Sequence, residues 1–189
     1  FSLKDFNLSD CEFEYRNSVF KKNKNLIILS VKLKLTNNNH DINTSYGDIN
    51  DELKKSNIYN PTIKDISRVI SDIRRRKLPD PKQIGNAGSF FKNPIVNKEK
   101  LNWIEKHHKN VPSYKIDKNY YKIPAAWLIE AAGLKGKKFG KFGIHKSQPL
   151  VLVNYGGAKG GDIYKLSLSI KQIIKKIFKI ELETEVNII

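Results

Sequence analysis

The chain has 189 residues, a length that suits one domain or two small ones. Its single cysteine, Cys11, excludes an internal disulfide and favours a reducing, cytoplasmic compartment, and no apolar run approaches the roughly 20 residues that a membrane-spanning helix needs. The formal net charge is +16, from 35 Lys and Arg against 19 Asp and Glu, which suits a nucleic acid, an anionic small ligand or a lysine-rich residue usage; the even spread of the basic residues favours the last.

The first part of the chain combines a mixed segment with one predicted strand. Tyr15 and Arg16 lie in the mixed segment, where an arginine is ordinarily a surface residue. Over residues 26–35, leucine and valine alternate with lysine, and this period of two predicts a half-buried strand. The polar run 37–40 ends the strand, and Tyr46 follows as a loop aromatic to which the pattern alone assigns no role.

Residues 62–76 are predicted to form a helix. Thr62 and Asp65 resemble a capping pair at its start, and isoleucines and Val69 recur along one apolar face. Basic residues at 74–77 close the last turn, where positive charge complements the helix dipole. We therefore interpret the basic run as a charged helix end and not as a nucleic-acid-binding patch.

The stretch from Lys77 to Pro94 is the most informative part of the sequence. Two prolines near its start end the helix, and the segment 85–88 tolerates positive φ and a close approach of the backbone to a ligand. The hydroxyl of Ser89 follows directly. Lys77 and Asn93 flank the loop and could hold an anion by charge and by amide donors. On composition alone, a glycine-rich connector is the simpler interpretation.

The remainder of the chain alternates between predicted helices and strands. The helices cover 97–109, 124–133 and a segment that begins at Asp162, and the strands cover 141–144, 150–154 and 180–188. His107 and His108 are adjacent and so point to different faces, without ligands at metal spacing, which predicts no metal site. The glycine loop 156–161 precedes a helix and could hold phosphate, but it lacks the Walker pattern, so we expect a simple helix entry.

Three glutamates, Glu181, Glu183 and Glu185, alternate along the last predicted strand. Such an alternation is usually a solvated face of a sheet. The residues alone therefore leave open whether any one of them has a function.

These motifs resemble, in the same order, those of the UDP-N-acetylenolpyruvoylglucosamine reductase family. The match is nearly unbroken from Lys77 to Pro94 and includes the run GNAGSFFKNP. Further matches lie at Tyr15–Phe20, Tyr46–Asp48, Pro124–Gly136, His145–Asn154 and Leu182–Val186. Asn17 and Thr184 depart from the pattern, which more often has aspartate and proline there. Tyr46 is similar to the tyrosine that defines one of the two subtypes of the family.

The resemblance implies a reaction and a set of roles. The reaction is the NADPH-dependent, FAD-mediated reduction of UDP-N-acetylglucosamine enolpyruvate to UDP-N-acetylmuramate, a precursor of bacterial peptidoglycan. The implied catalytic residues are Arg16, Ser89 and Glu185, with Ser89 as the proton donor. The implied substrate-binding residues are Tyr15, Tyr46, Lys77 and Asn93, of which the last three hold the diphosphate.

The resemblance also implies an α+β fold and a division of the chain. Residues 1–78 would complete a second FAD-binding lobe, 79–179 would form the substrate-binding domain, and 180–189 would return to the first lobe as a strand. The loop that binds the flavin pyrophosphate in this family has no counterpart here, and the chain has no methionine and begins at Phe1. We therefore expect the C-terminal portion of a cytoplasmic, monomeric enzyme, which by itself binds FAD weakly or not at all.

Two other classes remain open. A truncated, non-catalytic fragment would bind a UDP-sugar weakly and carry no flavin. A basic nucleic-acid-binding module would explain the charge but not the order of the motifs.

Overall fold

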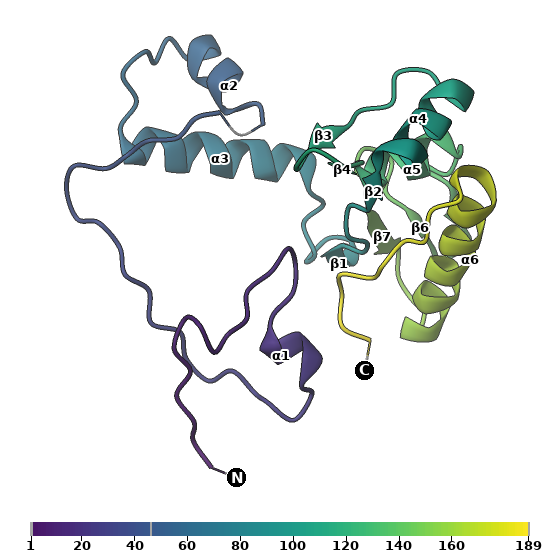
Figure 1. Ribbon diagram of the computed structural model, residues 1–189, viewed down its shortest axis with the longest axis horizontal. Helices are drawn as coiled ribbons and strands as arrows, with labels where there is room; N and C mark the ends of the chain where they lie inside the picture. Colours follow the sequence, from purple (N-terminus) through teal and green to yellow (C-terminus); the bar gives the residue numbers. More distant parts are fainter. Residues whose placement is uncertain (1, 46, 189) are drawn as a thin grey trace. The chain divides into compact units, whose positions relative to one another are not determined.

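The structure is a computed structural model that describes residues 2–45 and 47–188. It divides into two compact units, Phe1–Asn43 and Thr44–Ile189, which are described separately below. Helices and antiparallel sheets are mixed along the chain, so the predicted α+β fold is confirmed (Figure 1). The predicted boundary near residue 78, between an FAD-binding lobe and a substrate-binding domain, stays a prediction.

The first unit contains one short helix, α1 (Val19–Lys22), among turns and extended segments. The strand predicted over 26–35 is wrong, because no described residue pairs with this segment in a ladder. Val31, Leu33 and Leu35 are 70% to 82% exposed. An alternating pattern specifies which face of a strand is apolar, but a strand forms only where another strand satisfies its backbone groups.

In the second unit, α2 (Ile49–Lys55) packs against α3 (Ile63–Lys77). The capping box predicted for α3 is confirmed, since Thr62 Oγ1 accepts the Asp65 N–H at 3.3 Å and the Asp65 carboxylate accepts the Thr62 N–H at 3.0 Å. Ile49, Leu53 and Val69 form a small buried cluster between the two helices. The sequence analysis missed α2 because so short a helix depends on this packing more than on its own propensity.

Two antiparallel sheets carry the rest of the second unit. The larger sheet has the order β1-β7-β6-β5, made of Gly85–Ser89, Val151–Asn154, Phe142–Ile144 and Lys138–Phe139. The smaller sheet has the order β2-β4-β3, made of Ile95–Asn97, Tyr120–Lys122 and Tyr114–Lys115. The predicted pairing of the strands near 141–144 and 150–154 is confirmed by β6 and β7.

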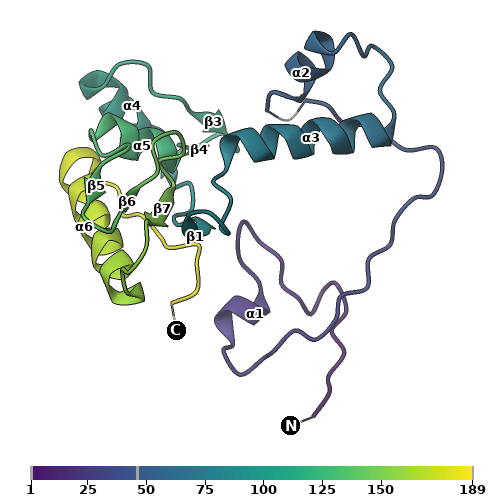
Figure 2. The ribbon, with the colours of Figure 1, turned by 180° about the vertical axis from the view of Figure 1, so that it is seen from behind.

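Three helices cover these sheets: α4 (Lys98–His107), α5 (Ala125–Ala131) and α6 (Gly160–Phe178). The longest, α6, lies alongside β6 and β7 (Figure 2) and buries Leu166, Ile170, Ile174 and Phe178 in the main core. Among the described residues, no helix combines the length and the apolar composition that a membrane crossing requires. The core thus holds β7 firmly, and β7 is the strand on which β1 depends for its register.

Candidate functional site

Ser89 is exposed at the end of β1, directly after a bulge in that strand. Asn86 lies opposite Val153 and Ser89 opposite Val151, so β1 advances by three residues while β7 advances by two. Gly88 takes a φ of 72° within the bulge, and the Asn86 Oδ1 accepts the Gly88 N–H at 3.0 Å. A bulge of this kind re-aims the side chain that follows it. The glycine-rich segment that looks like a connector is therefore a strand with a built irregularity before Ser89.

The C-terminal segment pairs with the residues that directly follow β1 and brings the backbone of Glu185 close to the end of that strand. The Glu185 N–H donates to the Phe90 carbonyl at 2.8 Å, and Phe91 and Thr184 form an antiparallel bridge. Antiparallel register then places Glu185 opposite Phe90, the residue that follows Ser89. The buried side chains of Leu182 and Ile180 anchor this segment in the core. The strand predicted over 180–188 is thus reduced to a short pairing, but the pairing lies where the candidate acid residues are.

The three alternating glutamates have different surroundings. Glu181 pairs with Lys175, and this hydrogen-bonded cation lowers the pKa of the Glu181 carboxyl. Glu183 pairs with Lys92 at 2.9 Å while its side chain stays 74% exposed. Glu185, in contrast, is half-buried next to the end of β1. Two of the three carboxylates therefore serve surface ion pairs, and the third is the one at the candidate site.

Asn93 connects the candidate site to the start of α5. Its Oδ1 accepts the N–H of Ala125 at 2.9 Å, which satisfies one of the N–H groups that a helix leaves unpaired at its first turn. The side chain is half-buried. Because the amide oxygen is occupied, the amide NH₂ group is the part of Asn93 that can donate to an anion.

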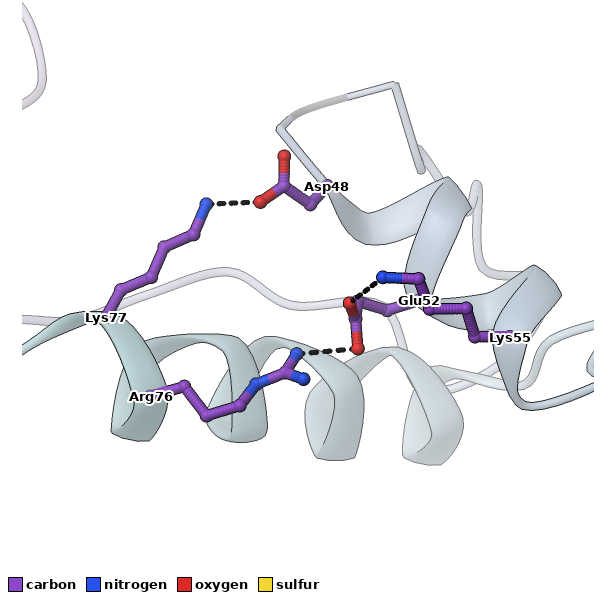
Figure 3. Close-up of polar contacts among 5 residues, drawn as sticks. All are labelled: Asp48, Glu52, Lys55, Arg76 and Lys77. Carbon is purple, nitrogen blue, oxygen red and sulfur yellow. Dashed lines mark hydrogen bonds and ion pairs between the residues drawn. The ribbon is translucent and has the colours of Figure 1, made fainter.

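Lys77 lies at the C-terminal end of α3, and its ammonium group pairs with the Asp48 carboxylate at the start of α2 (Figure 3). The side chains of Lys77 and Asp48 are 49% and 51% exposed, so the pair is open to solvent. A hydrogen bond from Asn86 Nδ2 to the Pro79 carbonyl, 3.4 Å long, ties the segment after α3 to β1. Tyr46, the other residue predicted at the diphosphate, lies outside the described residues.

Two further basic residues at the end of α3, Arg75 and Arg76, have acidic partners. Arg76 pairs with Glu52 at 2.6 Å (Figure 3), and Arg75 pairs with Asp72 at 3.0 Å. The hydrogen bond from Arg76 and, after it, the one from Lys55 hold the pKa of the Glu52 carboxyl below its ordinary value. The pairing supports the interpretation of the basic run as a helix end.

Tyr15 and Arg16 belong to the first unit and form the tip of a tight turn. Glu14 and Asn17 exchange backbone hydrogen bonds of 3.1 and 3.2 Å across this turn. Arg16 has a φ of 54°, and its guanidinium lies over the Tyr15 ring at 5.7 Å from the ring centre. Positive φ is uncommon for a residue with a Cβ. The turn therefore presents both predicted residues together on an exposed tip.

His145, which the sequence analysis treats as structural, supports the turn between β6 and β7. Its Nδ1 accepts the Gln148 N–H at 3.2 Å, and the Ser147 hydroxyl lies 3.4 Å from the same nitrogen. Burial, with a smaller contribution from the charge of Lys146, lowers the pKa of His145. The neutral ring is the form that can accept at Nδ1.

The structure thus brings some predicted residues together and leaves others apart. Ser89, Glu185 and Asn93 share the region where β1 meets the C-terminal segment and α5 begins. Sequence reasoning missed Asp48 as a functional candidate, although it stands in a quoted motif, because its partner is far away in the sequence. No group of three or more potential metal ligands occurs among the residues that the structure describes.

Chemically, the residues near the end of β1 include a hydroxyl, a half-buried carboxyl and an amide donor. Lysine and arginine side chains are available elsewhere on the chain for anionic groups. Such a set can bind a carboxylate or phosphate and can move one proton.

Comparisons with known proteins place the chain among named relatives. A family model described as "UDP-N-acetylenolpyruvoylglucosamine reductase, C-terminal domain" matches residues 80–189. Curated relatives of the name UDP-N-acetylenolpyruvoylglucosamine reductase include those of Flavobacterium johnsoniae (50% identical over 188 residues) and Amoebophilus asiaticus (44% over 189 residues). The matches cover 98% and 99% of this chain, but in both cases 56% of the relative. The chain therefore spans little more than half the length of these relatives.

Proposed function

Because this chain belongs to the UDP-N-acetylenolpyruvoylglucosamine reductase family, as its C-terminal portion, we propose that it supplies the substrate site and the proton donor for reduction of UDP-N-acetylglucosamine enolpyruvate to UDP-N-acetylmuramate. The observation that carries the proposal is the pairing of the C-terminal segment with the residues that follow β1, which sets the backbone of Glu185 opposite Phe90, the residue after Ser89. The names of the relatives support an oxidoreductase that acts in peptidoglycan synthesis.

Negative charge is the first problem that the protein must solve. When a hydride adds to the terminal carbon of the enolpyruvyl ether, charge develops on the carbon next to the carboxylate. Arg16 would stabilise this enediolate-like charge by a two-point contact with the carboxylate, for which the planar guanidinium is suited. Glu185, if protonated, would donate a hydrogen bond to the same carboxylate. The exposed position of Arg16 at the tip of its turn is compatible with this role.

Protonation of that carbon completes the reduction, and Ser89 would supply the proton. A serine hydroxyl is a weak acid, but the carbanionic intermediate is a strong base, so a well-positioned hydroxyl suffices. The bulge in β1 fixes the backbone just before Ser89 through the hydrogen bond from Gly88 to Asn86. This local rigidity supports Ser89 as a positioned donor.

The remaining predicted residues would bind the nucleotide part of the substrate. Lys77 would contribute charge and Asn93 its NH₂ donor to the diphosphate, with Tyr46 beside them and Tyr15 on the substrate. The bond from the Ala125 N–H holds the Asn93 amide by its oxygen, and its NH₂ group is the part that can donate to an anionic ligand.

FAD and NADPH are the cofactors that such a reductase would use for hydride chemistry. A glycine loop before a helix can bind the pyrophosphate of FAD, and this chain has one before α6. The residues of this loop do not fit a pyrophosphate. The Asp162 carboxylate accepts the Lys159 N–H at 2.9 Å, so a negative charge already occupies the start of the helix. We therefore assign no FAD-binding residue within this chain.

The proposal is tested by separating protonation from hydride chemistry in a full-length reductase that carries this sequence. Ser89→Ala should lower turnover by about 10²- to 10⁴-fold, as expected for loss of one positioned proton donor. Substrate affinity and the rate of flavin reduction by NADPH should stay near those of the unchanged protein. Stopped-flow absorbance of the flavin, beside steady-state turnover, measures both.

Ser89→Cys is the matched variant, because it keeps an ionisable hydrogen and should lose less activity than Ser89→Ala. Turnover of Ser89→Ala within a few-fold of the unchanged protein would remove Ser89 from the reaction. A collapse of flavin reduction would instead mean that Ser89 holds another part of the site in place.

A further inference from the structure

Asp48 occupies the position before the first turn of α2, yet it does not cap that helix. An aspartate at this position ordinarily accepts a backbone N–H from the first turn. Its backbone has φ −90° and ψ 13°, and its carboxylate makes no capping hydrogen bond. The carboxylate pairs instead with the ammonium group of Lys77 (Figure 3). A local stabilising contact is thus forgone in favour of a contact with a distant residue of the candidate site.

The packing of α2 on α3 holds Asp48 in this place. Ile49 and Leu53 of α2 are buried against Val69 of α3. One turn beyond Asp48, Glu52 pairs with Arg76 at 2.6 Å, and the Glu52 side chain is 18% exposed. The apolar cluster and the Arg76 pair together fix the start of α2 over the last turn of α3, where Lys77 lies (Figure 3).

We propose that Asp48 is a positioning residue that holds the Lys77 ammonium group ready for the diphosphate of the substrate. This inference rests on the proposed function, which assigns Lys77 to the diphosphate. Asp48 would hold the Lys77 ammonium group directly. The packing of α2 on α3, with the pair between Glu52 and Arg76, would hold Asp48 in place.

The physical reason is preorganisation. A lysine side chain has many rotamers in solution, and a ligand that captures it must order it. A lysine ammonium group has three N–H donors, so a bond to Asp48 leaves two for phosphate oxygens. With both side chains about half exposed, a ligand can reach the pair without displacing Asp48. Loss of the Asp48 carboxylate would therefore weaken diphosphate binding, although it removes a negative charge from the site.

The test is a double-mutant cycle with UDP-N-acetylglucosamine, which carries the diphosphate but no enolpyruvyl group. Lys77→Ala should raise the dissociation constant about tenfold or more, and Asp48→Asn about three- to fivefold. In the Lys77→Ala background, Asp48→Asn should have no further effect. Asp48→Glu, which keeps the charge, should restore most of the affinity. Binding is followed by NMR titration of this chain, because Lys77, Asn93 and Asp48 all belong to its second unit.

Asp51→Asn is the matched control, since it removes the same charge from the exposed first turn of α2. It should leave the dissociation constant unchanged, and thermal unfolding should show that both Asn variants are folded alike. If Asp48→Asn binds as the control does, binds more tightly, or weakens binding equally without Lys77, the positioning role is refuted while the Lys77 assignment stands. If Lys77→Ala has no effect, or the unchanged chain does not bind, the proposed diphosphate site itself fails.

Discussion

Some of the predicted functional residues adopt uncommon backbone conformations that the sequence pattern does not reveal. Arg16 takes a φ of 54° at the tip of its turn, a conformation that costs a residue with a Cβ roughly 1–2 kcal/mol. Glycine would adopt it without that penalty. An arginine retained in such a conformation supports a role for its side chain. The family resemblance assigns it one, on the carboxylate of the substrate.

His145 provides a pH dependence at the same scale. Its pKa is lowered from the ordinary value of 6.5 by burial, with help from Lys146. The unfolded chain therefore binds a proton at a pH where the folded chain does not. The stabilisation is fully present above the ordinary pKa and is lost as the pH falls through the lowered one. We expect the free energy of unfolding to decrease as the pH is lowered from 7 towards 5, as measured by urea unfolding.

The contribution of His145 is isolated by substitution. His145→Gln should flatten this part of the pH profile, because a glutamine side chain does not titrate. An identical slope in the His145 variant and the unchanged chain would contradict the assignment.

At the scale of elements, two ends of secondary structure create the site. β1 ends at Ser89 after a bulge, and α5 begins at Ala125 with its N–H bound by Asn93. The bulge depends on Gly88, whose φ of 72° suits a glycine. The bond from Asn93 means that one side chain has both a structural and a proposed binding role, and a mutation can separate the two.

Asn93→Asp should separate these roles. The aspartate keeps an oxygen for the Ala125 N–H and suits the positive end of a helix dipole, so stability should change by less than about 0.5 kcal/mol. It also loses the NH₂ donor and places a negative charge at the diphosphate, so the dissociation constant for UDP-N-acetylglucosamine should rise more than about tenfold.

Asn93→Ala is the complementary variant. It removes the bond to Ala125 and should lower the free energy of unfolding by about 1 kcal/mol in urea unfolding. Unchanged affinity in the aspartate variant, measured by NMR titration, would remove Asn93 from the ligand and leave it a purely structural residue.

At the scale of the whole molecule, the chain consists of two compact units, and the proposed roles are divided between them. Arg16 and Tyr15 lie in the first unit, whereas Ser89, Glu185, Lys77 and Asn93 lie in the second. The curated relatives are longer, and the matched region is 56% of two of them. The activity of a whole reductase therefore remains a proposal, and the binding functions of the second unit are the part that this chain can test by itself.

The prediction at this scale concerns the cofactor. The family loop for the flavin pyrophosphate has no counterpart in the sequence, and the glycine loop before α6 is closed by the Asp162 carboxylate. We expect this chain alone to bind FAD weakly or not at all. Titration of FAD, followed by the quenching of its fluorescence, should not saturate in the micromolar range. A yellow protein, purified with FAD bound, would contradict the prediction.

Local sequence patterns determined those features of this protein that depend on contacts between residues close together in the chain. Thr62 and Asp65 form the predicted capping box, and the periodic apolar residues of α6 lie on its buried face. The order of the motifs was enough to predict the family, which the comparisons confirm. Such features depend on contacts between residues a few positions apart, or on the amino-acid types of the motifs themselves.

Only the tertiary structure decided which groups that are distant in the sequence meet. Three glutamates alternate at the end of the chain, and the backbone of one of them, Glu185, pairs with Phe90 next to the end of β1. Asp48 stands where a helix cap is expected, but the packing of α2 on α3 brings its carboxylate into an ion pair with Lys77. Residues 26–35 have the pattern of a strand and yet form none. In each case the outcome depends on a distant partner, because a sequence pattern specifies a residue's own preference while hydrogen bonds and ion pairs require two groups to meet.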